Sequence, residues 1–375
     1  MRPLRVLSLF DGMSCGQIAL RELGYPIEKY YASEVDKFAI AQTQLNFPDT
    51  IQLGDVRNLE VDSILQDGDI DLLIAGSPCT NLSFAGKRNG LLTTTKEEIY
   101  TLDRYLELKE QGFEFEGQSY LFWEFMRIFH DLKKRNPNLL FLLENVEMGQ
   151  MWEEVFSTAI GIHGVHIDAA LMSAQRRKRI YWTNIRVTYH EDRLLPFSDI
   201  PQPEDRGIML KDILETEVEE KYYLKDEVVQ KLIGHNEANS HLLKNITDTE
   251  GKAHTFLATS HKGAWANGMS LIVQRGVVRV DDSPKASQPD HVYSKDGKSP
   301  TLGSNHFANT INVALDFRIR RITPTECARL QTVPEWYIWN CSATQQYRLL
   351  GNGWCVEVIK HIFSFLSEHF EQQIN

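Results

Sequence analysis

The chain has 375 residues, of which 42% are hydrophobic and 24% charged, a composition typical of a folded protein with one large and one smaller domain. The formal net charge of −11 argues against a protein that coats nucleic acid nonspecifically, although a local basic face is compatible with it. No apolar run is long enough to cross a membrane, and no signal peptide precedes the first expected strand. We therefore expect a cytoplasmic protein without a membrane partner.

The chain contains five cysteines, whose spacing includes neither a CxxC pair nor the ligand pattern of a zinc site. We therefore expect free thiols, as in a reducing compartment, and no metal site. The five are Cys15, Cys79, Cys327, Cys341 and Cys355.

The first fifty residues alternate between strand-like and helix-like segments. Strands are predicted over 4–10, 30–34 and 51–53, with a helix through Leu23 after the first and a helix capped by Asp36 after the second. Such alternation is typical of parallel βαβ units, so we expect an α/β protein.

Glycine and acidic residues follow the ends of these strands. Gly12 allows a ligand to approach the backbone, and the helix after it offers its N-terminus. Glu34 is placed to accept hydrogen bonds from ribose hydroxyls, and Asp55 lies within reach of an adenine amino group. The pattern predicts a nucleotide-like cofactor, although a nicotinamide oxidoreductase, or a glycine-bearing turn without a ligand, would share it.

A buried strand is predicted over 72–75, and it ends abruptly in a Gly-Ser-Pro sequence followed by Cys79. Ligands of open α/β sheets bind outside the carboxyl ends of the strands, which places Cys79 where a nucleophile would lie. The alternative is a cysteine buried as a small hydrophobic residue, which the polar residues after it disfavour.

The polar, glycine-bearing segment 84–117 predicts a mobile loop that closes over a substrate. A helix is expected over 119–132 and a strand over 138–143. That strand ends at Glu144, on the same edge as Cys79, although an acid at a helix N-terminus would look the same.

Segments 165–171 and 179–185 predict an antiparallel pair joined by a basic run. Alternation along the strand points Arg177 and Arg179 to one side, which suits recognition of phosphate or carboxylate. The alternative for such a run is a solvated charged face.

The character of the sequence changes after Pro196. A linker and an acidic helical stretch to about residue 233 are expected, and then a smaller, loop-rich domain whose recognition loops lie in 234–310. Thr323 or Thr325 is expected to cap a helix, and an amphipathic helix over 356–370 is expected to pack back on the N-terminal sheet.

Over residues 4–195 and 316–375 the chain resembles the cytosine-5 DNA methyltransferases. Six motifs in the family's order carry this resemblance: Phe10-Asp-Gly12, Gly76-Ser-Pro-Cys79, Glu144-Asn-Val146, Gln175-Arg-Arg-Lys-Arg179, Arg320 to Leu330 and Gly351-Asn-Gly353. One departure is Ser14, which stands where the family's cofactor turn usually has a second glycine. This turn is similar to that of the animal de novo branch.

The resemblance implies a Rossmann-like S-adenosylmethionine-dependent methyltransferase sheet with helices on both faces. Residues 1–198 would form the catalytic and cofactor-binding domain, 199–315 a loop-rich target-recognition domain, and 316–375 a return to the catalytic domain. The reaction would transfer a methyl group from S-adenosylmethionine to C5 of a flipped-out cytosine in double-stranded DNA and leave S-adenosylhomocysteine.

In this interpretation Cys79 attacks C6 of the cytosine, Glu144 contacts N3 and the exocyclic amine, and Arg177 and Arg179 orient the base or steady charge near the thiolate. The loop 83–89 would close on the flipped base. The resemblance also implies cofactor contacts by Phe10, Asp11, Gly12, Ser14, Gly16, Glu34, Val35, Asp55, Val56, Pro78, Asn352 and Trp354, and DNA contacts by Ser83, Lys87, Arg88, Gln175 and Arg320.

Two alternatives remain within the resemblance. A tRNA cytosine-5 methyltransferase shares these motifs, although the long 200–315 segment favours DNA, and a catalytically silent DNA-binding homologue would have no chemical need for Cys79, Glu144, Arg177 and Arg179 together. We expect a prokaryotic or phage enzyme, with a cognate restriction endonuclease as partner if it belongs to a restriction system.

Overall fold

A computed structural model describes residues 2–66, 68–78, 91–225, 227–229, 246–247, 249–262, 270–275, 292–294, 312–314 and 317–372. Cys79, Ser83, Lys87 and Arg88 lie outside the described residues, as does most of the expected recognition segment 234–310. No helix in the described ranges is long and apolar enough to cross a membrane.

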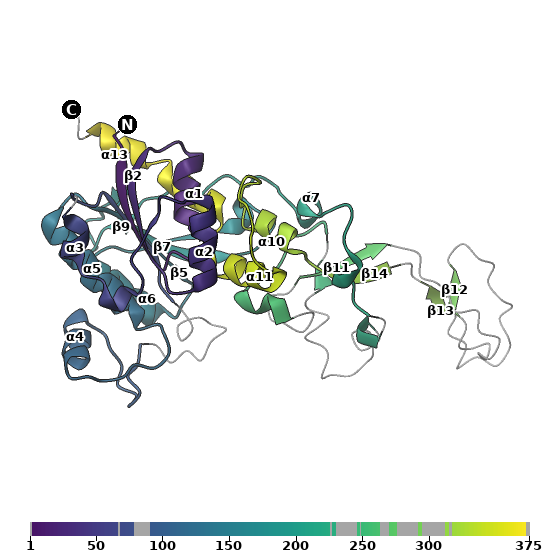
Figure 1. Ribbon diagram of the computed structural model, residues 1–375, viewed down its shortest axis with the longest axis horizontal. Helices are drawn as coiled ribbons and strands as arrows, with labels where there is room; N and C mark the ends of the chain where they lie inside the picture. Colours follow the sequence, from purple (N-terminus) through teal and green to yellow (C-terminus); the bar gives the residue numbers. More distant parts are fainter. Residues whose placement is uncertain are drawn as a thin grey trace.

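A seven-stranded sheet with the order β3-β2-β1-β4-β5-β7-β6 forms the centre of the larger part of the molecule (Figure 1). The first five strands in this order run parallel, and β7 runs antiparallel to both of its neighbours. The strands are β1 Leu4–Leu9, β2 Ile27–Ser33, β3 Ile51–Gln52, β4 Leu72–Gly76, β5 Leu140–Val146, β6 Val165–Asp168 and β7 Lys178–Thr183. The predicted Rossmann-like α/β class is thereby confirmed.

Helices cover both faces of this sheet because its strands are apolar on both sides. Alternate residues of β4 illustrate this: Leu72 and Ile74 pack in one apolar core, and Leu73 and Ala75 in the other. The first core contains helices α1 (Cys15–Glu22) and α12 (Val356–Phe363), and the second contains α5 (Leu121–Arg135) and α6 (Gln150–Ile160).

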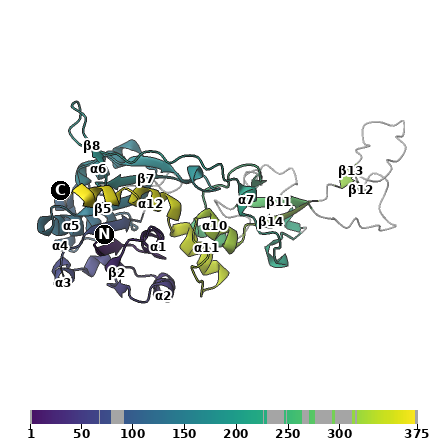
Figure 2. The same ribbon diagram turned by 90° about the horizontal axis from the view of Figure 1, so that it is seen from above.

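The C-terminal end of the chain returns to the seven-stranded sheet, as the amphipathic pattern predicted. Helix α12 packs against α1, and the Tyr25 hydroxyl donates a hydrogen bond to the Phe363 carbonyl (3.2 Å). Figure 2 shows the yellow C-terminal helices beside the N-terminal strands. The expected single helix over 356–370 is interrupted, because Ser364 and Phe365 form a turn before α13 (Leu366–Gln372).

Asp36 caps α2 (Lys37–Asn46) as predicted, through a hydrogen bond from the Phe38 amide. Thr323, and not Thr325, caps α10 (Pro324–Leu330), and Ser342 caps α11 (Ala343–Asn352). Short elements complete this part of the chain: η1 Val56–Asn58, α3 Val61–Leu65, η2 Ala169–Leu171, β8 Val187–Thr188 and β9 Phe197–Ser198.

Two expectations for irregular or helical segments were wrong. The described part of the expected loop 84–117 contains α4 (Leu102–Glu110), because Thr101 supplies an N-cap and Tyr105 and Leu108 supply a buried apolar face. Within the described ranges the acidic stretch after Pro203 forms α7 (Leu210–Ile213), η3 (Glu220–Tyr222) and a helical run at 227–229, and not one continuous helix, since its acidic residues leave few apolar positions with helical spacing.

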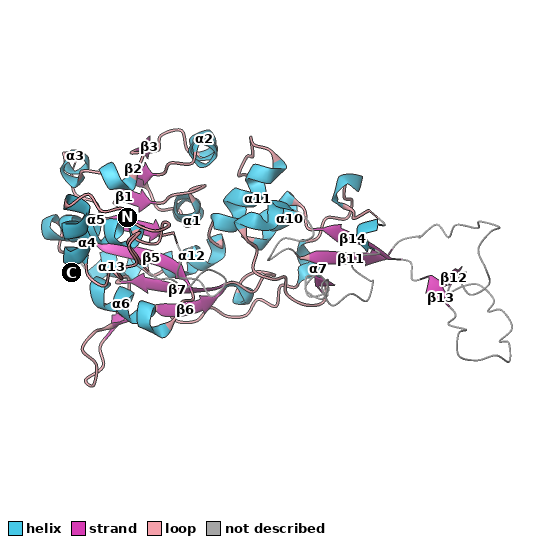
Figure 3. Ribbon diagram, turned by 90° about the horizontal axis from the view of Figure 1, so that it is seen from below, coloured by secondary structure: helices cyan, strands magenta, loops and turns pink. Residues whose placement is uncertain are grey.

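A smaller sheet with the order β10-β11-β14 lies apart from the first one. Helices α10 and α11 lie between the two sheets, next to β11 and β14 (Figure 3). The strands outside the large sheet are β10 Ile246–Thr247, β11 Leu271–Arg275, β12 Val292–Ser294, β13 Asn312–Ala314 and β14 Phe317–Arg321, and η5 spans Ala258–Lys262. The division into 1–198, 199–315 and 316–375 stays a prediction.

Candidate active site

The carboxyl ends of β4 and β5 and the start of β7 meet at one edge of the large sheet. Gly76, the last residue of β4, pairs in register with Glu144 of β5, and Val146 pairs with Arg179 near the start of β7. Ser77 and Pro78 follow Gly76 and lead to Cys79. Glu144 therefore lies within a strand and not at a helix N-terminus, since α6 begins only at Gln150.

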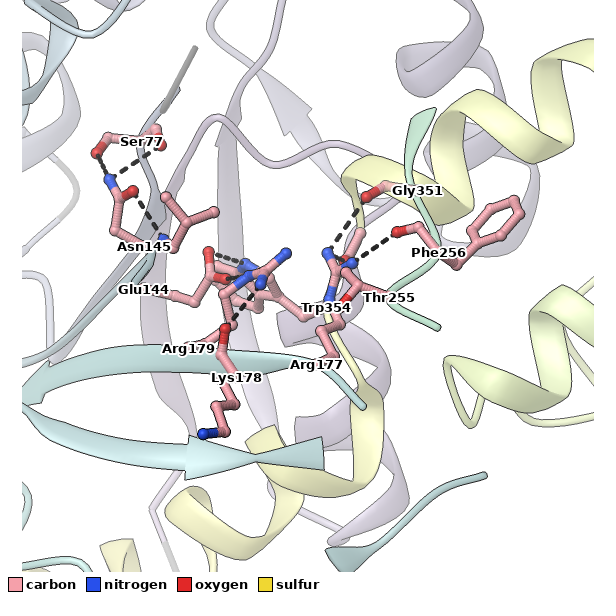
Figure 4. Close-up of polar contacts among 12 residues, drawn as sticks. Ser77, Glu144, Asn145, Arg177, Lys178, Arg179, Thr255, Phe256, Gly351 and Trp354 are labelled. Atoms are coloured by element: carbon pink, nitrogen blue, oxygen red, sulfur yellow. Dashed lines mark hydrogen bonds and ion pairs between the residues drawn. The ribbon is translucent and has the colours of Figure 1, made fainter. Parts of the chain in front are cut away.

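Two donors hold the carboxylate of Glu144, a residue that is 7% exposed. Arg179 Nε lies 2.9 Å from Oε1, and the indole Nε1 of Trp354 donates a 3.0 Å hydrogen bond to Oε2 (Figure 4). A carboxylate has about four lone-pair positions, so these two contacts leave acceptor capacity for a ligand. The arrangement fits a group that orients a base through hydrogen bonds.

Asn145 joins the ends of β4 and β5. Its Nδ2 donates to the Ser77 hydroxyl oxygen (2.9 Å) and to the Ser77 carbonyl (3.3 Å), and the residue is buried. The strand pattern assigned no role to Asn145, although an amide between two strand ends is a signal that could have indicated one. The contact fixes the backbone from which the chain continues to Cys79.

Arg177 and Arg179 do not act as a matching pair. Arg177 is buried and donates to the carbonyls of Phe256 (2.9 Å), Gly351 (3.2 Å) and Gly353 (2.8 Å), as Figure 4 shows in part. Burial, together with the positive charge of Arg179, lowers the pKa of Arg177 to about 10. Its contacts therefore connect three chain segments, and only Arg179 reaches Glu144.

Gln175 and Arg320, for which the resemblance implies DNA contacts, are both buried and contact protein groups in this structure, and their DNA contacts stay a prediction. Gln175 Nε2 donates to the Leu330 carbonyl (2.7 Å) and to Gln331 (2.9 Å). Arg320 forms a two-bond ion pair with Glu326, at 2.8 Å for each bond. The guanidinium of Arg320 and the Nε2 of Gln175 thus have protein partners, whereas the buried Oε1 of Gln175 accepts no hydrogen bond from the described residues.

The turn after β1 has an unusual backbone. Phe10, Gly12 and Ser14 have φ values of 58°, 58° and 67°, so three alternate residues adopt the left-handed conformation. Ser14 thus keeps the backbone shape that a glycine would adopt without strain, and its hydroxyl donates to Gln17 (3.2 Å). The Gly12 amide donates to Glu34 Oε2 (2.8 Å), which ties the turn to the end of β2.

Asp11 has a buried oxygen that lacks a partner. Its Oδ1 accepts a hydrogen bond from the Tyr30 hydroxyl (2.9 Å), whereas Oδ2 accepts none from the described residues. Burial raises the pKa of Asp11 to about 6. An orphaned anionic acceptor at this turn fits a ligand that carries a positive charge and N–H donors, as S-adenosylmethionine does.

The other expected cofactor residues differ in what they offer. Asp55 follows β3, caps η1 and pairs with the Arg57 guanidinium, which holds the pKa of that carboxyl below its usual range. Val35 and Asn352 are exposed, Val56 is buried, and Pro78 is half-buried. A Cβ at Gly16 would lie 2.2 Å from Cδ1 of Ile74, so this glycine serves the packing of α1 on the sheet, and its contact with the cofactor stays a prediction.

The family profile for C-5 cytosine-specific DNA methylases matches residues 4–158 and 167–368. The chain is 26% identical to the type II methyltransferase M.Bsp6I of Bacillus sp. (strain RFL6), with 96% of this chain and 97% of that protein covered. It is 25% identical to the orphan methyltransferase M.SPRI of Bacillus phage SPR, with 98% of each covered.

Among solved structures, S. pombe Dnmt2 methyltransferase matches with a TM-score of 0.61 and 18% identity, over 98% of this chain and 99% of that one. The Entamoeba histolytica methyltransferase EhMeth matches with a TM-score of 0.61 and 14% identity, over 99% of each chain. At such identities these two likenesses concern the fold.

Proposed function

The chain belongs to the C-5 cytosine-specific DNA methylase family and uses S-adenosylmethionine, and we propose that it methylates C5 of a flipped-out cytosine in double-stranded DNA through a covalent bond between Cys79 and cytosine C6. The observation that carries this proposal is the position of Glu144. Its carboxylate is fixed at the end of β5, directly beside the end of β4 from which the chain leads to Cys79.

In the proposed reaction the Cys79 thiolate adds to C6 and the electron pair of the C5–C6 bond moves to C5, which becomes nucleophilic. S-adenosylmethionine, when bound, would supply the methyl group to which C5 forms a bond, and the methyl–sulfur bond would break to leave S-adenosylhomocysteine. A water molecule then takes the C5 proton, and the electron pair of that C–H bond restores the C5–C6 double bond and expels the Cys79 thiolate. Glu144 accepts a hydrogen bond from the exocyclic amine, a donor that thymine lacks at the same ring position.

The two arginines have different roles in this proposal. Arg179 orients the Glu144 carboxylate through its 2.9 Å contact, whereas Arg177 positions the backbone of the C-terminal return segment. For the cofactor, Phe10, Gly12 and Ser14 shape the turn, and Asp11 and Glu34 supply anionic acceptors on either side of it.

Methyl transfer with tritiated S-adenosylmethionine tests the proposal. Wild-type protein and Cys79→Ser would each be incubated with double-stranded DNA and, separately, with tRNA, and bisulfite sequencing would locate the modified cytosines. Cys79→Ser is expected to lose transfer but retain cofactor binding, because a hydroxyl is a far weaker nucleophile than a thiolate.

Each outcome has a distinct meaning. Transfer to tRNA alone would support the tRNA-methyltransferase alternative, and cofactor binding without transfer to either substrate would support the silent homologue. Transfer by Cys79→Ser at the wild-type rate would contradict the covalent mechanism. The similar bacterial and phage proteins include both type II and orphan methyltransferases. We therefore propose a cognate restriction endonuclease as partner only if this enzyme belongs to a restriction system.

A further inference from the structure

Trp354 makes a contact that links the C-terminal return segment to the sheet edge. Its indole Nε1 donates a 3.0 Å hydrogen bond to Glu144 Oε2, and the two residues are 210 positions apart in the sequence. The ring also lies against the end of β4, where a Cβ on Gly76 would come within 2.8 Å of the same nitrogen. The indole therefore lies between the strand that leads to Cys79 and the carboxylate on β5.

Hydrogen bonds fix the backbone next to Trp354. The carbonyl of Gly353 accepts hydrogen bonds from Arg177 (2.8 Å) and from Gln331 (3.3 Å). Gln331 also donates to the Leu350 carbonyl (2.6 Å). Trp354 lies between α11, which ends at Asn352, and α12, which begins at Val356, so these donors from other parts of the chain help to set its position.

We propose that Trp354 is a positioning residue that fixes the orientation of the Glu144 carboxylate toward the target base. This inference rests on the proposed function of Glu144. Arg179 contacts only Oε1 of Glu144. Without a second contact, the carboxylate would be free to rotate about that one. The indole N–H, which can only donate, holds Oε2 and so determines the plane of the group.

The sharpest variant removes only the donor. Replacement of Trp354 by 3-benzothienylalanine keeps the bicyclic ring and puts sulfur in place of the N–H, whereas Trp354→Phe also loses ring area. Trp336→Phe is the matched control, because Trp336 donates a 2.7 Å indole hydrogen bond to the Glu22 carboxylate on the outer end of α1.

Single-turnover methyl transfer and equilibrium binding would be measured for each variant on the full chain. We expect both Trp354 variants to lower the transfer rate about tenfold to a hundredfold, as small misplacements of a catalytic group do. The Kd for DNA should stay within about threefold of wild type. The resemblance also implies a cofactor contact for Trp354, so the transfer rate is compared at saturating S-adenosylmethionine, where a weaker cofactor contact alone would leave it unchanged. Trp336→Phe should keep the wild-type rate.

Nuclear magnetic resonance of the indole N–H groups gives a readout that does not depend on activity. The chain has seven tryptophans, and Trp354→Phe identifies the resonance of residue 354. We expect Glu144→Gln to shift that resonance and to leave the Trp336 resonance unchanged.

The outcomes separate the two proposals. An inactive wild-type protein would overturn the proposed function and the inference with it. An active wild type combined with a fully active benzothienylalanine variant, or with a rate loss explained by weaker cofactor binding alone, would overturn only the role of Trp354. An unshifted Trp354 resonance in Glu144→Gln would do the same.

Discussion

Gly76 and Trp354 lie so close together that β4 must end in glycine. A Cβ at position 76 would come within 2.8 Å of the indole Nε1 and 3.0 Å of Cζ2. The ring would have to move, and its hydrogen bond to Glu144 would break first.

Gly76→Ala is therefore expected to lower the free energy of unfolding by about 1–3 kcal/mol, the usual range for overpacking. It should also lower the methyl-transfer rate of the protein that remains folded. Thermal unfolding and single-turnover kinetics would measure the two effects. Gly149→Ala is the control, since a Cβ there meets no atom within 4 Å and the residue has an ordinary φ of −65°. Equal activity of the two variants would contradict the prediction.

Ser14→Gly is expected to be at least as stable as the wild type. Relief of the left-handed strain, about 1–2 kcal/mol, offsets the loss of the hydrogen bond to Gln17, about 1 kcal/mol. Ser342→Gly should be less stable than wild type, because Ser342 caps α11 with an ordinary φ of −62°. Denaturant unfolding would compare them, and a marked loss of stability in Ser14→Gly would argue against strain at this turn.

Asp11→Asn should change the pH dependence of stability in the cofactor-free protein. The folded state raises the pKa of Asp11 to about 6, so it binds the proton more tightly than the unfolded chain. The wild type therefore loses stability from this group as pH rises from about 4 through about 6.

The neutral amide does not titrate in this window. The free energy of unfolding of Asp11→Asn, relative to that of the wild type, should therefore increase by about 1–3 kcal/mol between pH 4 and pH 7.5. Urea unfolding at both pH values measures the gain. Parallel stability curves for the two proteins would contradict burial of a charged Asp11.

Glu326→Gln is expected to destabilise the protein by about 3–5 kcal/mol, because it removes the negative charge from a buried, two-bond ion pair with Arg320. Glu220→Gln breaks a similar pair with Arg318 at the surface, and should change stability by at most about 1 kcal/mol. Unfolding free energies of both variants test the contrast, and a similar small loss in each would mean that Arg320 is solvated.

Local patterns predicted much of the fold. Apolar runs and turn residues indicated the strands, Asp36 marked the start of α2, and strand order placed Glu144 on the edge that leads to Cys79. These features are encoded within a few neighbouring residues. Helix α4 could also have been predicted, since the cap at Thr101 and the spacing of Tyr105 and Leu108 are helical, but the polar composition around them obscured the signal.

The partners of the arginines could not be predicted in the same way. An arginine on a strand looks the same in the sequence whether it faces a phosphate, a carboxylate or a backbone carbonyl. Arg177 finds its partners 79, 174 and 176 residues away, and no local pattern encodes contacts over such separations. The same holds for the indole of Trp354, whose carboxylate partner is 210 residues distant.

The three carbonyl contacts of Arg177 have a consequence for the biosynthesis of the protein. Gly351 lies 174 residues after Arg177, which at about 5–20 residues per second corresponds to a delay of about 9–35 s on the ribosome. During that interval the sheet can form, but the guanidinium lacks two of its acceptors and Glu144 lacks its indole donor. We expect the nascent chain to acquire its catalytic geometry only after translation of the return segment, so that growing polypeptides attached to ribosomes do not modify DNA.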